Sequence, residues 1–318
     1  MYFKTLRIVR RAGWLSLAAL LLLFGRPASE SLAQPQRVAD INMYNSASVS
    51  DAVYYDDGSG TALYFISTLN YGERASGTET YPSLYRFDGT TTQYIETLST
   101  GNLDLSEMSL VVYDDGTGAR LCFPQDAGFD AALGCYDGTS TETIGAFSDD
   151  VAPGEFAVLN GDLYFRAVDS SAGNEVHVYD GTSVRLLPEL NPSGDADPEA
   201  LTAYTNGTDA EVCYFGASDT AYGLACTDGT STTLVRAFEP WSEPGSIGGV
   251  NFEIRPEMQV MGNELYFVAD DASAGQELFQ YDGSTVVLTE EVASGFYNDA
   301  FPNGLTAYDD GSGAALHF

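Results

Sequence analysis

Tyr179-Asp180-Gly181-Thr182 is one copy of a short tag that decides the fold of this chain. The other copies are Phe87-Asp88-Gly89-Thr90, Tyr136-Asp137-Gly138-Thr139, Thr227-Asp228-Gly229-Thr230 and Tyr281-Asp282-Gly283-Ser284. Successive tag aspartates are 49, 43, 48 and 54 residues apart, and a repeat of roughly 40 to 50 residues is typical of propeller blades. The sequence therefore predicts an all-β fold, a β-propeller of about six four-stranded antiparallel blades.

Each repeat carries two hairpin signals. The first is an Asp-Gly or Asn-Gly turn between two alternating runs, as in Val53-Tyr54-Tyr55 and Leu63-Tyr64-Phe65 around Asp56-Asp57-Gly58-Ser59-Gly60. These residues tolerate the positive φ of tight hairpin turns. The tag is the second turn, between the third and fourth strands. The residues assigned to this second turn are Asp88, Gly89, Asp137, Gly138, Asp180, Gly181, Asp228, Gly229, Asp282 and Gly283.

The third run and the tag resemble a known repeat. Residues 277–284 and 175–182 are similar to the ELWxxDGT repeat of exported bacterial proteins, with Phe279 or His177 in place of the usual Trp. The resemblance covers essentially all of residues 40–318. It implies an extracytoplasmic array like a β-propeller, and it supplies no catalytic residues.

The N-terminus has the features of an export signal. Basic residues precede an apolar run at 14–24, and Ser31-Leu32-Ala33 is a small-x-small cleavage site. We therefore assign residues 1–33 to a signal peptide and 34–318 to the propeller, with the mature protein in the periplasm, at the cell surface or outside the cell. An uncleaved anchor is the alternative, although a run of 11 residues is short for a bilayer.

The propeller contains five full repeats and a partial sixth. The sixth consists of one hairpin, with runs at 305–308 and 316–318 around Asp309-Asp310-Gly311-Ser312-Gly313. Residues 36–41 lie where a fourth strand would precede the first blade, so we expect them to pair into the sixth. Either the last blade is incomplete, or the chain is a segment of a longer protein such as an adhesin.

The chain without its signal is strongly acidic. It has 8 basic residues against 45 acidic ones, a net charge of −37, and every basic residue is Arg. Phosphate backbones and anionic lipids would repel such a chain, so nucleic acid and polybasic membrane docking are not expected. The Lys-free acidic surface resembles that of halophilic proteins, in which salt screens the repulsion. A merely acidic exported protein is the alternative.

The four cysteines form two pairs with the same spacing. Cys122 and Cys135 are 13 residues apart, as are Cys213 and Cys226, and each second cysteine lies two residues before a tag aspartate. Each pair would join the second strand of a blade to the adjacent third strand, close enough for a disulfide. An oxidising compartment favours such bridges. A four-cysteine metal site is the alternative, which the spacing does not fit.

The two cysteine repeats also lack an aromatic residue three positions before the tag aspartate. They have Gly134 and Ala225 there. We hypothesise that the covalent link compensates for the lost aromatic packing.

Catalytic chemistry has little support in the sequence. His177 and His317 fall on predicted strands, as packing or surface residues, and the mature chain has no Lys for a phosphate loop or a Schiff base. Carboxylates are abundant, but they recur at equivalent turns, where turn chemistry explains them. Paired acids are weak candidates for calcium ligands. These acids are Asp56, Asp57, Asp114, Asp115, Asp309 and Asp310.

Two long loops are the first places to expect a ligand, because exposed aromatics on loops make carbohydrate or protein contacts. One loop holds Tyr71 and Arg74, and the other holds Trp241. The sequence thus favours a secreted or cell-surface binding or structural module without catalytic activity, whose ligand is a glycan or a surface protein. A secreted hydrolase or lyase that uses carboxylates is the main alternative.

Overall fold

The computed structural model describes the strands of the chain and most of their turns. The described residues are 5–6, 48–70, 80–100, 103, 105, 108–128, 130–147, 152–240, 256–273, 275–290, 304–309, 311 and 313–317. None of them lies in an α-helix, and within these ranges no helix is long and apolar enough to span a membrane. Their strands form six antiparallel sheets, five with four strands and one with three.

Each four-stranded sheet is a continuous piece of chain whose strands pair in sequence order, and we call it a blade. Blade 1 contains β2 (Ser48–Asp56), β3 (Thr61–Asn70), β4 (Thr80–Phe87) and β5 (Thr92–Thr97). Blade 2 contains β6 (Val111–Asp114), β7 (Ala119–Ala127), β8 (Asp130–Tyr136) and β9 (Thr141–Phe147). Blade 3 contains β10 (Gly154–Leu159), β11 (Asp162–Asp169), β12 (Gly173–Tyr179) and β13 (Val184–Leu186). Blade 4 contains β14 (Glu199–Thr205), β15 (Ala210–Ala217), β16 (Tyr222–Thr227) and β17 (Thr232–Phe238). Blade 5 contains β18 (Met258–Met261), β19 (Glu264–Asp271), β20 (Gly275–Tyr281) and β21 (Val286–Glu290).

The sixth sheet has the order β1-β23-β22, with β22 (Thr306–Asp309) and β23 (Ala314–His317) forming the predicted hairpin. Its third strand is β1 (Thr5–Leu6), from the segment assigned to the signal peptide. The predicted closing strand at residues 36–41 lies outside the described residues.

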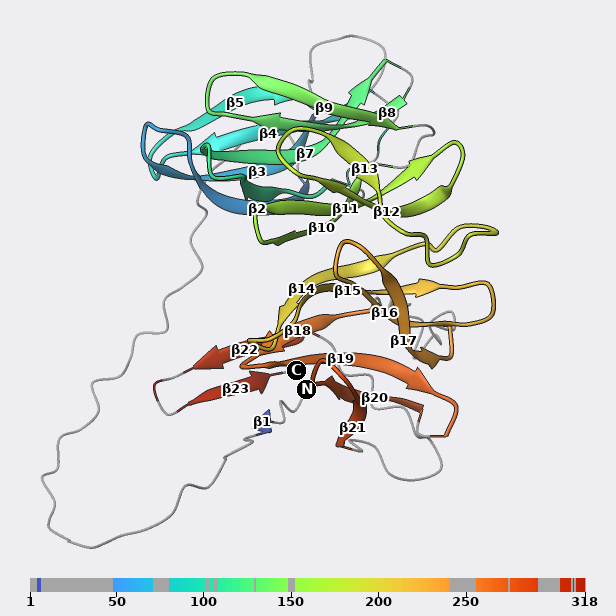
Figure 1. The fold of residues 1–318 in the computed structure, drawn as a ribbon. Coiled ribbons are helices and arrows are strands. Elements are labelled where there is room, and N and C mark those ends of the chain that lie inside the picture. The colour runs from blue at the N-terminus through green and yellow to red at the C-terminus, as the bar shows by residue number, and fades with distance from the viewer. Residues whose placement is uncertain are drawn as a thin grey trace, which may run out of the picture.

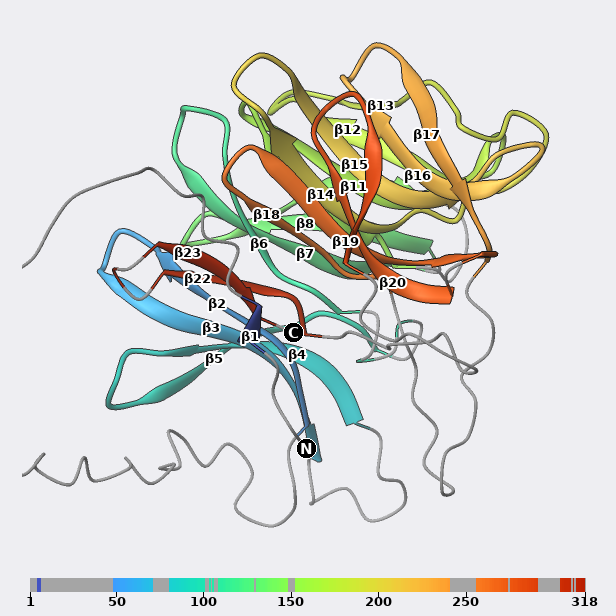
Figure 2. The same cartoon turned by 90° about the horizontal axis from the view of Figure 1, so that it is seen from below.

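The blades follow one another along an arc. The first strands are in contact from one blade to the next, β2 with β6, β6 with β10, β10 with β14, β14 with β18 and β18 with β22. Figure 1 shows blade 1 and the sixth sheet at the two ends of this arc, which is not closed, and Figure 2 shows the same blades from below. The fold is thus the predicted propeller-type array of antiparallel blades.

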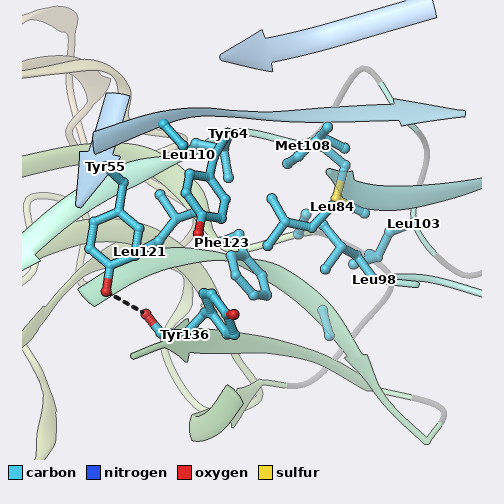
Figure 3. Packing of buried hydrophobic residues seen from close by; sticks show 14 residues of the cluster. Tyr55, Tyr64, Leu84, Leu98, Leu103, Met108, Leu110, Leu121, Phe123 and Tyr136 are labelled. Atoms are coloured by element: carbon cyan, nitrogen blue, oxygen red, sulfur yellow. Dashed lines mark hydrogen bonds between the residues drawn. The ribbon is translucent and has the colours of Figure 1, made fainter. Parts of the chain in front are cut away.

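The hydrophobic core lies between the blades. Figure 3 shows the cluster between blades 1 and 2, where Tyr55 and Tyr64 point toward Tyr136. The Tyr55 and Tyr64 ring centroids are 5.3 Å apart, and those of Tyr64 and Tyr136 are 6.2 Å apart. The Tyr55 hydroxyl donates to the carbonyl oxygens of Ala119 at 3.0 Å and Tyr136 at 3.4 Å. Tyr55 therefore bonds blade 1 to blade 2.

This contact recurs along the arc. Tyr113 lies near the end of the first strand of blade 2, and its ring centroid is 5.5 Å from that of Tyr179 in blade 3. Tyr204 of blade 4 lies 5.4 Å from Tyr281 of blade 5, and its hydroxyl donates to the carbonyl of Asn263 at 2.9 Å. The first-strand tyrosines, Tyr55, Tyr113 and Tyr204, are each at most 2% exposed. In these three interfaces, the tyrosine just before a tag thus contacts the first-strand tyrosine of the preceding blade.

Every tag forms the turn between a third and a fourth strand, as predicted. One carboxylate oxygen of the tag aspartate accepts the backbone N–H groups two and three residues later, at 2.7 to 2.9 Å in all five copies. The glycine after it has a φ of +85° to +98°, which favours glycine over residues with a Cβ. Turn chemistry therefore accounts for the recurring Asp-Gly pair.

The tag glycine also has a second role, because the first hairpin of the preceding blade packs against it. A Cβ on Gly138 would lie 2.5 Å from the carbonyl oxygen of Asp57, and one on Gly181 would lie 2.7 Å from a carboxylate oxygen of Asp115. A Cβ on Gly229 would lie 2.9 Å from the Tyr164 hydroxyl of blade 3. One on Gly283 would lie 2.2 Å from the side-chain nitrogen of Asn206 in blade 4. A Cβ on Gly89 of blade 1 would have nothing within 4 Å, and blade 1 is the first blade of the arc among the described residues.

We predict that Gly138→Ala destabilises the protein more than Gly89→Ala. Both positions have the same tag geometry, with φ of +98° and +95°, so both variants share the backbone strain. Only Gly138→Ala also pushes a neighbouring backbone away, which should cost roughly 1–3 kcal/mol more. Urea unfolding midpoints of the two variants would measure the difference, and equal midpoints would contradict the packing role.

Candidate functional site

The loop residues singled out in the sequence are not placed by the structure. Tyr71, Arg74 and Trp241 all lie outside the described residues. Their role as ligand contacts stays a prediction.

The paired acids are engaged by their own turns and neighbours. One oxygen of Asp56 accepts the N–H of Gly58 at 3.0 Å. Asp57 accepts the Tyr64 hydroxyl at 2.7 Å and the Arg86 Nε at 2.8 Å. Burial alone would raise the pKa of Asp57, but these hydrogen bonds and the Arg86 charge hold it well below its usual range. Equivalent turn bonds are made by Asp114, Asp115 and Asp309. Asp310 lies outside the described residues, and calcium binding stays a prediction.

Both predicted disulfides are present. Cys122 is bonded to Cys135 and Cys213 to Cys226, with Cα atoms 4.1 Å apart in each pair. The cysteines of a pair lie directly opposite each other on the second and third strands of blades 2 and 4. Since all four cysteine sulfurs are used in disulfides, the four-cysteine metal site is excluded. The two bridges indicate an oxidising environment.

The disulfides alternate with aromatic pairs along the arc. In blades 1, 3 and 5 the second and third strands carry stacked rings, with centroids 5.5 to 5.9 Å apart. These pairs are Phe65–Tyr85, Phe165–His177 and Phe267–Phe279. At the same register, blades 2 and 4 pair Phe123 with Gly134 and Tyr214 with Ala225. The arrangement fits the hypothesis that a covalent link replaces a ring pair.

We predict that removing the bridges lowers the melting temperature. A disulfide that closes a loop of this size typically contributes about 2–4 kcal/mol, so the variant with all four cysteines changed to Ala should melt several degrees lower. Differential scanning calorimetry with and without reductant measures this. The cysteine-free variant is the control, because reductant should not affect it. An unchanged melting temperature on reduction of the native chain would contradict the hypothesis.

The two histidines have packing positions. His177 is 3% exposed, and its ring stacks on Phe165 and meets the edge of Phe147 at 5.4 Å. Burial lowers the pKa of His177 below its ordinary value. His317 lies on β23, with its ring 6.1 Å from that of Tyr308.

Two clefts flank the turn between β11 and β12, and they share Val168, Asp169 and Ser170. The aromatic cleft, about 310 Å³ in volume, lies toward blade 2 and is also lined by Phe147, His177 and Arg185. The acidic cleft, about 550 Å³ in volume, lies toward the connection into blade 4. Its further lining includes Ser171, Glu189, Pro192, Ser193 and Asp195.

The clefts are found where blade 3 departs from the repeat. Its fourth strand, β13, has three residues, whereas β5, β9, β17 and β21 have five to seven. β13 therefore pairs only with residues 177–179 of β12. The first half of β12 is left to the connection at 187–198, which leaves room for a cleft.

The connection is fastened to the β11–β12 turn. Asp169 accepts the N–H of Ser171 at 2.7 Å and so closes the turn. A carboxylate oxygen of Asp195 accepts the N–H of Asn174 at 2.8 Å. The same oxygen would lie 2.1 Å from a Cβ on Gly173, whose φ is +83°. The acidic cleft therefore has a fixed wall and depends on a glycine at position 173.

Glu175 lies on β12 beside the acidic cleft and is 1% exposed. Its Oε1 atom has no hydrogen-bond partner. Burial, with repulsion from Glu189 and a smaller contribution from Asp195, raises its pKa to about 8, although the backbone of Ala196 opposes the shift. Glu175 is therefore largely protonated at neutral pH. Sequence reasoning missed this, because Glu175 and Val176 face opposite sides of β12 and the sequence did not show that both sides are buried.

Backbone strain is concentrated in the same region. Among the described residues, the non-glycine residues with positive φ are Glu155, Asn160, Asp197 and Ala200, with φ from +47° to +57°. All belong to blade 3, its connection or the start of blade 4. A carboxylate oxygen of Glu155 accepts the N–H of Ala200 at 2.7 Å, which holds the first strands of the two blades together. Such strain often marks functional sites.

Comparisons with known proteins match only at the level of structure. No protein family and no curated protein matches the sequence. The chain is similar to a mutant puromycin hydrolase, with a TM-score of 0.47 and 14% identity over 85% of this chain and 42% of that one. It thus spans less than half of that enzyme. It is also similar to the lectin of the fungus Aleuria aurantia, a six-bladed β-propeller with a novel mode of fucose recognition, with a TM-score of 0.41 and 11% identity over 77% of this chain and 78% of the lectin. An α-L-arabinofuranosidase of Clostridium thermocellum has a TM-score of 0.35 and 10% identity over 77% of this chain and 94% of that one.

We predict that Glu175 makes stability fall as pH rises. Its pKa goes from 4.5 in the unfolded chain to about 8 in the folded one, so between these values the folded state keeps a proton that the unfolded state releases. The protonated Glu175 contributes fully to the free energy of unfolding below pH 4.5. As the pH rises from there toward 8, this free energy falls by up to about 1.4 kcal/mol per pH unit.

Glu175→Gln removes this titration while keeping the shape of the side chain. The free energy of unfolding of the variant, measured with urea from pH 4 to 9, should rise relative to the native chain with increasing pH. Glu142→Gln, at a carboxylate that is 69% exposed, is the matched control for the loss of one surface charge. Parallel curves for Glu175→Gln and the native chain would contradict the assignment.

Proposed function

We propose that the protein is an exported β-propeller module that binds carbohydrate in the two clefts beside the β11–β12 turn. The observation that carries the proposal is the departure of blade 3 from the repeat. In that blade a shortened fourth strand, two clefts and strained backbone come together. Blade 2 also has a cleft, of about 540 Å³ and lined in part by Arg120, Asp137 and Glu142, but its fourth strand has the usual length and its described backbone has no positive φ outside glycine.

The size of the clefts supports a small ligand. Their volumes of about 310 and 550 Å³ lie in the usual range of roughly 300–1,000 Å³ for small-molecule sites. Because they share the β11–β12 turn, a ligand with two or more sugar units can contact both.

The lining chemistry supports hydroxyl-rich ligands. Carboxylates of Asp169 and Glu189 can accept hydrogen bonds from sugar hydroxyls, and the hydroxyls of Ser170 and Ser193 can donate or accept them. The negative charge disfavours sulfated or phosphorylated glycans. A neutral or amine-bearing glycan therefore fits best.

A hydrolase is the second candidate, and one observation favours it. Glu175 has a raised pKa, as a general acid requires, and it has ionisable carboxylates nearby. Against this, Glu175 is 1% exposed and lines neither cleft. A proton donor must reach the bond that breaks, so the geometry favours binding over catalysis.

Export is part of the proposal. The two disulfides fit an oxidising compartment, and the N-terminal sequence has the pattern of a secretion signal. A carbohydrate-binding role is natural at a cell surface or in a matrix.

The test is a screen of immobilised glycans at low and high NaCl, with and without Ca²⁺, followed by calorimetry on the glycans retained. Glu189→Gln should weaken binding roughly tenfold, because it removes a charged hydrogen-bond acceptor from the acidic cleft. Asp130→Asn, beside the β7–β8 turn of blade 2 and outside both clefts, also removes one carboxylate charge and is the control that should bind normally.

Product analysis of each retained glycan separates the two candidates. Binding without cleavage supports the module, and cleavage that Glu175→Gln abolishes would establish the hydrolase instead. If no glycan is retained, or if Glu189→Gln binds as well as the native chain, the proposed site is wrong.

A further inference from the structure

Each contact between neighbouring blades has two halves. The first half is the end of a first strand, where Tyr55 of blade 1 is 2% exposed and bonds to blade 2. The second half is the tag of the next blade, where Tyr136 and Gly138 receive it. We call the first half the latch and the second half the receptor.

The sixth sheet has a latch that no tag contacts in this structure. Tyr308 pairs with Ala315 across the β22–β23 hairpin as Tyr55 pairs with Ala62 in blade 1. Asp309 accepts the N–H groups of the two following glycines at 2.8 and 3.2 Å, as Asp56 does at 3.0 and 3.2 Å. The hairpins therefore have the same geometry. Yet Tyr308 is 60% exposed, whereas Tyr55 is 2% exposed.

The ring contact beside this tyrosine is also conserved in geometry. The rings of Tyr308 and His317 meet edge to face at 69°, and those of Tyr55 and Tyr64 do so at 64°. The face of the sixth sheet is thus arranged as in blade 1, where the same face is buried.

Blade 1 has the matching empty receptor. A Cβ on its tag glycine, Gly89, would have nothing within 4 Å, whereas all four later tag glycines are contacted by the preceding blade. On the same face Tyr54 is 71% exposed. Leu63 and Phe87 are half-buried, while their counterparts Leu121 and Tyr136 in blade 2 are buried.

We propose that the latch of the sixth sheet binds the receptor of blade 1 on a second copy of this chain. The interfaces between blades 1 and 2, 2 and 3, and 4 and 5 are the template for the contact, since it uses the same hairpin, tyrosine and tag glycine. The two surfaces lie at the two ends of the open arc (Figure 1). They do not meet in this structure, because a Cβ on Gly89 has nothing within 4 Å and Tyr308 is 60% exposed. Because the contact joins two different surfaces, it is heterologous and can extend into chains of molecules.

The negative charge of the chain makes this association dependent on salt. Two copies, each with a formal net charge of −33, repel one another at low ionic strength, and salt screens this repulsion. Apolar contacts at the interface are not weakened by salt. Assembly should therefore strengthen as NaCl is raised.

Sedimentation velocity on the full chain, over a range of concentrations at low and high NaCl, tests the proposal. The native chain should form species larger than a dimer at high concentration and high salt. Gly89→Leu fills the receptor, and Tyr308→Ala removes the latch. Each variant alone should associate at least about tenfold more weakly than the native chain.

Mixing the two variants gives the decisive measurement. Gly89→Leu keeps its latch and Tyr308→Ala keeps its receptor, so an equimolar mixture should form dimers and nothing larger. Gly128→Leu, which also has a positive φ of +81° and open space around its Cβ, controls for backbone strain and should assemble like the native chain. Circular dichroism confirms that each variant is folded.

A native chain that stays monomeric at every concentration and salt would overturn the proposal. So would a mixture that forms no more dimer than either variant alone. A monomer whose melting temperature drops with Tyr308→Ala and Gly89→Leu alike would show that the two surfaces meet within one molecule instead.

Discussion

The arrangement of the blades depends on the close approach of one hairpin to the tag glycine of the next blade. At Gly138 this approach leaves 2.5 Å between a hypothetical Cβ and the Asp57 carbonyl oxygen, a space that only glycine can provide. The same glycine needs a positive φ to close its own turn. One residue therefore sets both the local turn and the stacking of the blades, and the tyrosine contacts next to it seal the interface. This explains why the Asp-Gly pair recurs when neighbouring positions vary from repeat to repeat.

The acidic composition is compatible with this fold because much of the charge is used locally. The tag aspartates accept backbone N–H groups, and these bonds lower the pKa of Asp137, Asp228 and Asp282 to about 2. They remain ionised through the physiological range and gain hydrogen bonds that an unfolded chain lacks. Among the described arginines, Arg86, Arg120, Arg185 and Arg236 also make hydrogen bonds or ion pairs within the fold, as in the 2.6 Å ion pair between Arg236 and Asp271. The composition alone suggested repulsion between the carboxylates, and the structure shows that backbone N–H groups and arginines offset part of it.

Much of the fold was predictable because it repeats. The spacing of Asp88, Asp137 and the later tags indicated the blades, and the position of each cysteine relative to the tag was enough to place both disulfides. The clefts were not predictable in this way. They arise because β13 ends at Leu186. Pro188 was a signal of this early end, since proline cannot donate to a ladder, but the sequence did not show how the connection that follows would fold back. Glu175 was hidden for a different reason. Its identity was visible in the sequence, but its pKa depends on how the connection at 187–198 covers it.

A repeat protein acquires a specific site by breaking its repeat in one place. In blades 2 and 4 the departures are the cysteines, which form buried disulfides between the second and third strands. In blade 3 the departure removes part of a strand. The connection that replaces it has a positive φ at Asp197, near its end, and Ala200 at the start of β14 has another. Strain of this kind persists only where surrounding bonds hold it, and here the bond from Ala200 to Glu155 does so. The glutamate at position 155 thus ties the start of β14, just after the connection, to blade 3. A ligand that fits the acidic cleft would bind a rigid surface, with little conformational entropy to lose on binding.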